Sequence, residues 1–181
     1  MIQVREKDLP SHQVANLTER IKPAMQDKTI IIINSYLDAA VSSMANGVHL
    51  PQDFMSVEEA RSLLPPNMLV GKSVHDLSSA ILESQSGADY IILGTIFPTS
   101  SKPGMRTGGI PMVKEISNQI TSPLLVIGGI NGANAGSTIS AGADGIAVIS
   151  SILTSPNPEK AAKTLKTSMV EVWQAEPRQK P

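Results

Sequence analysis

Glycine and hydroxyl residues follow two apolar segments in the second half of the chain. Gly128 and Gly129 come directly after one apolar segment, and Ile149 and Ser150 end the next. In a barrel of alternating strands and helices, turns at these places present backbone N–H groups to a phosphate. Glycine suits such a turn because a Cβ atom would hold the anion away from the amides. The pattern predicts a phosphate site; the alternative is a tight strand-to-helix turn.

Two other polar segments carry cations. Thr99, Ser101 and Lys102 lie in one loop after an apolar segment, and two hydroxyls with an ammonium can converge on a phosphate or diphosphate. Arg5 and Lys7 are two residues apart, so both would face the same side of an extended strand. A solvated loop and a charged strand end are the alternatives.

The three histidines form no recognisable metal-binding pattern. His12 lies at an expected helix start, whereas His49 and His75 end two separate apolar segments. No His-x-x-x-His spacing and no carboxylate cluster predicts a bound transition metal. His49 and His75 could line a barrel, with either a catalytic or a structural role.

Short β-branched segments alternate with amphipathic stretches, which predicts a parallel α/β fold of the (β/α) TIM-barrel type. We expect one domain over residues 1–175 and a flexible tail over 176–181. Because a barrel needs eight strands, the first βα unit is expected to be missing. The seven expected strands are Gln3–Glu6, Thr29–Asn34, Gly47–Leu50, Met68–Val74, Tyr90–Ile96, Leu124–Gly128 and Gly145–Ile149.

Local signals mark several element ends. Ser11 is expected to be a helix N-cap, and Ser56 with Glu59 predicts a capping box. A Gly-Ala-Asp repeat, at 87–89 and 142–144, predicts a helix end followed by a strand, mostly for structural reasons.

Composition excludes several classes of function. The chain has 181 residues, 41% of them hydrophobic, a net charge of −1 and no cysteine. The charge gives no broad attraction for nucleic acid or acidic membranes. No apolar segment reaches the roughly 20 residues that span a bilayer. We expect a cytoplasmic protein without disulfides, nucleic-acid partners or membrane partners.

Four motifs, in order and spacing, resemble the thiamin phosphate synthase/TenI family. They are Gln3–Lys7, Gly71–His75, Gly94–Pro103 and Val126–Ile130. The family fold is a (β/α)8 barrel, and the missing unit would be its first strand and helix. The resemblance implies a small phosphorylated thiazole as ligand, and Mg²⁺ only if the chain is a synthase.

The resemblance also implies roles for individual residues. Arg5, Lys7, Asn34 and Lys102 match positions that serve a pyrophosphate, and Ser73 lies in a substrate-binding motif. The thiazole-phosphate positions are Thr99, Ser101, Gly128, Gly129, Ile149 and Ser150. The family's metal-binding aspartates correspond here to Ser35 and Phe54, with Asp53 one residue away. We therefore expect no firm metal site.

The lost carboxylates favour the TenI branch, and our first hypothesis is a thiazole tautomerase. That branch's histidine proton carrier corresponds to Thr95, which cannot titrate near neutral pH, so Lys102 or His75 would have to replace it. The alternatives are a thiamin phosphate synthase and a non-catalytic thiazole-phosphate-binding or regulatory protein. A barrel without its first unit would expose a strand edge, so we also expect a homo-oligomer.

Overall fold

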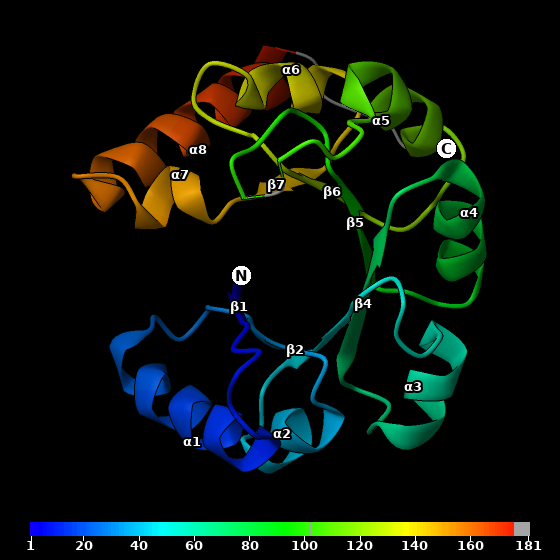
Figure 1. Ribbon diagram of the computed structural model, residues 1–181, viewed down its shortest axis with the longest axis vertical. Helices are drawn as coiled ribbons and strands as arrows, with labels where there is room; N and C mark the ends of the chain where they lie inside the picture. The colour runs from blue at the N-terminus through cyan, green and yellow to red at the C-terminus, as the bar shows by residue number, and fades with distance from the viewer. Residues whose placement is uncertain (102, 176–181) are drawn as a thin grey trace. The chain divides into compact units, whose positions relative to one another are not determined.

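The computed structural model describes residues 1–101 and 103–175 (Figure 1). It consists of two parts. The N-terminal part comprises Met1–Ser73 and Ser86–Asp89, and the C-terminal part comprises Val74–Gln85 and the described residues from Tyr90 onward. Lys102 and the expected tail at 176–181 lie outside the described residues.

Parallel strands alternate with helices in both parts, which is the TIM-type α/β arrangement that the sequence predicts. Seven strands occur among the described residues. In the N-terminal part they are β1 (Ile2–Val4), β2 (Ile31–Asn34), β3 (Gly47–Leu50) and β4 (Leu69–Val74), paired in this order. In the C-terminal part they are β5 (Tyr90–Gly94), β6 (Leu124–Ile127) and β7 (Gly145–Ala147).

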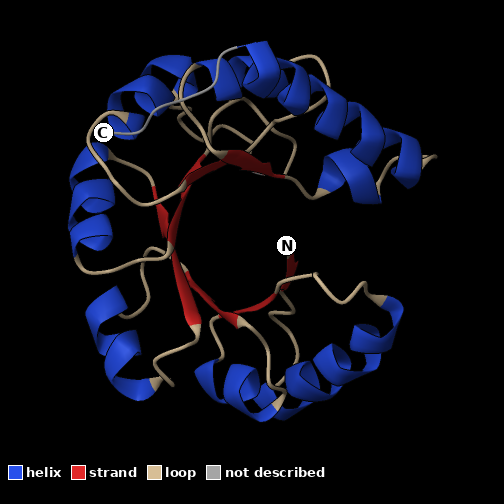
Figure 2. Ribbon diagram, turned by 180° about the vertical axis from the view of Figure 1, so that it is seen from behind, coloured by secondary structure: helices blue, strands red, loops and turns tan. Residues whose placement is uncertain are grey.

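Within each part the helices lie on one side of the strands (Figures 1 and 2). The N-terminal part has α1 (Ser11–Ile21), the short 3₁₀ helix η1 (Lys22–Ala24), α2 (Leu37–Ser42) and α3 (Val57–Leu63). The C-terminal part has α4 (Leu77–Gln85), α5 (Gly109–Ser117), α6 (Ala135–Ser140), α7 (Ser150–Leu153) and α8 (Pro158–Ala175). In the described residues, no helix combines the length and the apolar character needed to cross a bilayer.

The strands form where continuous β-branched residues can be buried on both faces. Ile32 and Ile33 of β2 and Val48 of β3 are completely buried, as are Ile91 and Leu93 of β5. Such runs are typical of parallel strands covered by helices. Polar side chains are therefore left mainly to the strand ends and the loops that follow them.

The Gly-Ala-Asp repeat makes the same two hydrogen bonds in both parts. The backbone N–H of Asp89 donates to the carbonyl of Val70 (2.9 Å), and its carboxylate accepts from the Val70 N–H (2.6 Å). Asp144 binds Leu124 in the same way, with both distances 2.7 Å. Each aspartate thus fixes the start of the preceding strand in the sheet, which is a structural role.

The two predicted helix caps have different outcomes. The capping box is confirmed, since Ser56 Oγ accepts from the Glu59 N–H (3.2 Å) and the Glu59 carboxylate accepts from the Ser56 N–H (2.8 Å). The Ser11 cap is wrong: α1 begins at Ser11, and Pro10 is the N-cap residue. Proline already has the extended backbone that an N-cap needs, so the helix starts one residue earlier than Ser11 capping requires.

Replacing Asp144 should destabilise the protein, because the buried Leu124 N–H would lose a charged acceptor. For Asp144→Ala we expect the free energy of unfolding to fall by about 2 kcal/mol. Urea unfolding would measure it, with Asp27→Ala as the control because Asp27 is exposed. Equal effects of the two substitutions would contradict the structural role of the repeat.

Candidate functional site

Polar side chains gather at the carboxyl ends of the strands in the N-terminal part. Asn34 is the register partner of His49 in the β2–β3 pair, and His49 is that of Gly71 in the β3–β4 pair. His49 Nε2 lies 2.7 Å from the Ser73 hydroxyl, and the Asn34 amide donates to the Ser35 hydroxyl (2.8 Å). We call Asn34, Ser35, His49 and Ser73 the strand-end cluster. It contains two predicted site residues, Asn34 and Ser73.

His49 is buried and neutral at neutral pH. Burial lowers the pKa of its imidazole to about 4, and the positive charges of Lys72 and Arg5 add to this effect. The side chain is only 3% exposed. The two charged groups that contribute to this shift, Lys72 and Arg5, are both cations, which oppose a further positive charge on the imidazole.

Lys72 is the main feature of this region that the sequence reasoning missed. It is 2% exposed, and its ammonium donates to the backbone carbonyls of Met55 (2.9 Å) and Phe54 (3.4 Å). These bonds hold the loop between β3 and α3. The available signal was a lysine inside an otherwise apolar strand, where a charge is costly unless it is hydrogen-bonded.

Ser35 has an unusual backbone conformation directly after β2. Its φ is 67°, in the left-handed region that few residues other than glycine adopt, and its N–H donates to the His49 carbonyl (3.0 Å). Such conformations cost roughly 1 kcal/mol or more and are common at functional sites. Asparagine and aspartate tolerate this region better than most residues.

Arg5 and Lys7 are exposed and follow β1, which ends at Val4. The strand does not extend to Glu6 as expected, so alternation along a strand does not put both side chains on one face. Arg5 is nevertheless linked to the cluster, because its charge helps to lower the pKa of His49.

In the C-terminal part, two glycines bring the ends of β5 and β6 together. Gly128 and Gly129 have φ values of 105° and 64°. The Phe97 N–H donates to the Gly128 carbonyl (3.0 Å). A Cβ atom at Gly128 would lie 2.5 Å from Thr95 Cγ2, and one at Gly129 would lie 2.7 Å from the Phe97 carbonyl oxygen. Glycine is therefore required at both positions by conformation and by space.

Two of the three residues considered for proton transfer, Thr95 and His75, are engaged in hydrogen bonds within the C-terminal part. Thr95 is buried, and its hydroxyl points to the sulfur of Met105 at 3.5 Å. His75 Nδ1 bonds to the Gly94 carbonyl, which can only accept, so Nδ1 carries the proton. Lys102 lies outside the described residues.

The remaining predicted phosphate residues lie in a loop or at the start of a helix in the C-terminal part. Thr99 Oγ1 accepts from the Ser101 N–H at 3.3 Å, which orders the turn between them. Ser150 is the first residue of α7, and Ile149 before it is 54% exposed. Ser101 is exposed as well, whereas Thr99 and Ser150 are half-buried.

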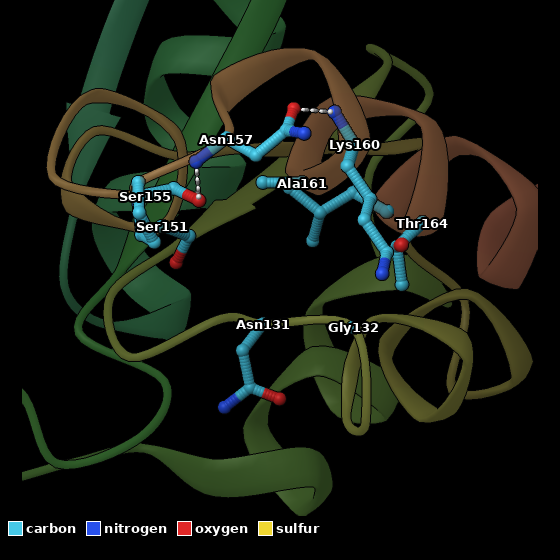
Figure 3. A pocket seen from close by; sticks show the side chains of 10 residues that line it. Asn131, Gly132, Ser151, Ser155, Asn157, Lys160, Ala161 and Thr164 are labelled. Carbon is cyan, nitrogen blue, oxygen red and sulfur yellow. Dashed lines mark hydrogen bonds between the residues drawn. The ribbon is translucent and has the colours of Figure 1, made fainter.

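A further hollow of about 520 Å³ lies beside α7 and α8 (Figure 3). Ser151, Ser155 and Lys160 line it, together with Asn131 and Asn157. Asn157 Oδ1 accepts from the Lys160 N–H (2.9 Å) and so caps α8. None of the predicted site residues that the structure describes lines this hollow, which sequence reasoning missed because its residues are scattered along the chain.

A Mg²⁺ ion does not fit the donors at the strand ends of the N-terminal part. Mg²⁺ prefers carboxylate oxygens. The two positions that the family resemblance assigns to metal-binding aspartates hold the Ser35 hydroxyl and the Phe54 ring. Within residues 1–101 and 103–175, no group of three or more histidine, aspartate or glutamate side chains could hold a metal.

Comparisons with known proteins identify the family and the type of fold. The family model described as thiamine monophosphate synthase matches residues 1–152. A thiamine-phosphate synthase of Methanoculleus marisnigri is 38% identical over 92% of this chain and 80% of its own length. One of Methanosarcina barkeri is 37% identical over 90% of this chain and 74% of its own length.

Solved structures agree with these matches. A thiamine phosphate pyrophosphorylase from Pyrococcus furiosus is 31% identical, with a TM-score of 0.86, over 94% of this chain and 83% of its own. A 3-hexulose-6-phosphate synthase, 19% identical with a TM-score of 0.71, over 93% of this chain and 86% of its own, shares the fold alone.

These comparisons correct one hypothesis from the sequence. The first hypothesis, a TenI-like thiazole tautomerase, is wrong, because the curated relatives that cover most of the chain are named thiamine-phosphate synthases. The lost carboxylates favoured the TenI branch, but they are two positions in a chain whose remaining sequence is similar to the synthases.

The pKa of His49 predicts a specific pH dependence of stability. Its folded-state pKa is lower than its unfolded value, so its contribution is complete above about pH 6.5 and is lost as the pH falls toward 4. We expect a loss of about 3 kcal/mol over this interval, at about 1.4 kcal/mol for each pH unit.

Urea unfolding at several pH values would measure this loss, and His49→Gln should remove it while His12→Gln, at an exposed site in α1, should not. An imidazole NMR signal of His49 that titrates near pH 6.5 would contradict the expectation.

Substitution of Gly129 and of Gly104 separates the effect of a positive φ angle from the effect of close packing after β6. Their φ values are similar, 64° and 72°, but a Cβ atom at Gly104 meets nothing within 4 Å. We expect Gly129→Ala to lower the free energy of unfolding by about 3 kcal/mol and Gly104→Ala by about 1 kcal/mol. Thermal and urea unfolding would compare them, and equal losses would show that the φ angle alone matters.

Proposed function

Because the chain belongs to the thiamine monophosphate synthase family, we propose that it joins a thiazole phosphate to hydroxymethylpyrimidine diphosphate. The thiazole ring nitrogen forms a bond to the pyrimidine methylene carbon. The carbon–oxygen bond to the diphosphate breaks, and pyrophosphate leaves with the electron pair. The products are thiamine phosphate and pyrophosphate.

The observation that carries this proposal is the similarity to named synthases over about nine-tenths of the chain. Small phosphorylated substrates are therefore expected. The polar strand ends and glycine turns support the proposal, because they supply cations, hydroxyls and backbone amides. The chain's net charge is only −1, so phosphate binding has to rely on such local groups.

We assign the two phosphorylated groups to different residues. Arg5, Lys7, Asn34 and Lys102 would bind the leaving diphosphate, where positive charge stabilises the transition state. Gly128, Gly129 and Ser150, with the loop of Thr99 and Ser101, would bind the thiazole phosphate through backbone amides and hydroxyls. The homo-oligomer and the cytoplasmic location expected from the sequence stay predictions.

Direct synthesis tests the proposed function. The purified chain, incubated with thiazole phosphate and hydroxymethylpyrimidine diphosphate, should form thiamine phosphate and an equal amount of pyrophosphate, measured by chromatography. Arg5→Gln should lower kcat/KM by about a hundredfold, because it removes one of the cations assigned here to the leaving diphosphate.

Lys28→Gln is the matched control, since Lys28 is exposed in the loop before β2. It should leave kcat/KM unchanged. Tight binding of both substrates without product would contradict the synthase and favour the non-catalytic binding protein.

A further inference from the structure

We propose that the strand ends of the N-terminal part hold the substrate's diphosphate directly through the chain's own cations and hydrogen-bond donors, without Mg²⁺, a proposal that rests on the proposed synthase function. The residues are the strand-end cluster together with Arg5 and the buried Lys72. Three features of this region support the proposal: its donor set, its backbone and its charge.

The donor set suits an anion better than a cation. The first side chain after β2 is the Ser35 hydroxyl, and one of its lone pairs already accepts a hydrogen bond from the Asn34 amide. His49 Nε2, the ring atom that could ligate a metal, is bonded to the Ser73 hydroxyl at 2.7 Å. Neutral, hydrogen-bonded groups are weak ligands for Mg²⁺, whereas hydroxyl and amide groups donate readily to phosphate oxygens.

The backbone does not explain why a carboxylate is missing here. Ser35 has a φ of 67°, and aspartate tolerates this left-handed region at least as well as serine. A metal-binding aspartate could therefore occupy the position without extra strain. The neutral side chain at residue 35 is then a property of the site's chemistry rather than a demand of the turn.

The charge at the strand ends is positive. His49 is held neutral by burial and by Lys72 and Arg5, so both cations act on the cluster. Lys72 also acts on Glu59, but that carboxylate is fully exposed and bonded to Ser56 in the capping box. A diphosphate gains from this field, whereas a divalent cation is repelled by it.

Lys72 supplies its charge from a fixed position. Its ammonium donates to the carbonyls of Phe54 and Met55, which belong to the loop that would carry a metal-binding carboxylate. A buried ammonium is less screened than one in solvent, so its charge acts at longer range. Lys72 is thus a positioning residue that replaces part of the charge of a metal ion.

Calorimetric titration of the full chain with inorganic pyrophosphate tests this inference. Pyrophosphate should bind in the presence of EDTA, and added Mg²⁺ should leave the affinity unchanged or weaken it, because Mg²⁺ competes for the ligand. Lys72→Met and Arg5→Met should each weaken binding by about tenfold. Lys28→Met, at an exposed lysine, should have no effect. Pyrophosphate binding that requires Mg²⁺ in the unmodified chain would overturn the inference.

A second variant keeps the test decisive if Lys72→Met does not fold. Ser35→Asp combined with Phe54→Asp restores two carboxylates where the resemblance places them. This double variant should lose Mg²⁺-independent pyrophosphate binding by about tenfold or more and should gain binding when Mg²⁺ is present. An unchanged, metal-independent affinity would show that these strand ends do not hold the anion.

The experiments distinguish failure of the metal-free diphosphate site from failure of the proposed synthase function. Pyrophosphate binding in EDTA without formation of thiamine phosphate supports the metal-free site and rejects the synthase. Thiamine phosphate formed only with Mg²⁺, together with no pyrophosphate binding in EDTA, supports the synthase and overturns the metal-free site. Product formed in EDTA supports both.

Discussion

Parallel strands that are buried on both faces decide where polar side chains can lie in this protein. Strands such as β2 and β5 have no surface on which polar side chains can be solvated, so their interiors are apolar. Polar groups that bind a ligand can then lie only at the carboxyl ends and in the loops that follow. Asn34, His49 and Gly128 all lie at or just after such ends. The packing that stabilises the sheet therefore also restricts the polar side chains that could bind a ligand to the carboxyl ends of the strands.

Lys72 is the exception to this rule, and its contacts explain how the exception is tolerated. An ammonium that is 2% exposed would be costly without partners, but two loop carbonyls accept hydrogen bonds from it. The lysine thereby orders the β3–α3 loop and adds positive charge near His49. The Lys72 side chain thus both orders a loop through hydrogen bonds and helps to lower the pKa of His49 in the strand-end cluster.

The sequence predicts the strands, which share one pattern, but it does not predict individual conformations and contacts such as those of Ser35 and Lys72. All seven strands were expected, because continuous β-branched segments bounded by glycine are typical of parallel strands. β1, β5, β6 and β7 nevertheless end one or two residues early, since strand ends depend on pairing, which no local pattern encodes. The φ of Ser35 and the burial of Lys72 could not be predicted for the same reason. Both arise from contacts between elements distant in sequence.

The wrong choice of the tautomerase shows how a missing residue can mislead. Considered alone, Ser35 and Phe54 indicate a change of reaction, because two metal-binding carboxylates are absent. A departing diphosphate requires positive charge, and a fixed ammonium can supply part of it as a metal ion does. Loss of metal ligands together with a buried lysine at the same strand ends is therefore compatible with the same reaction. The missing carboxylates and the buried lysine are better interpreted together than singly.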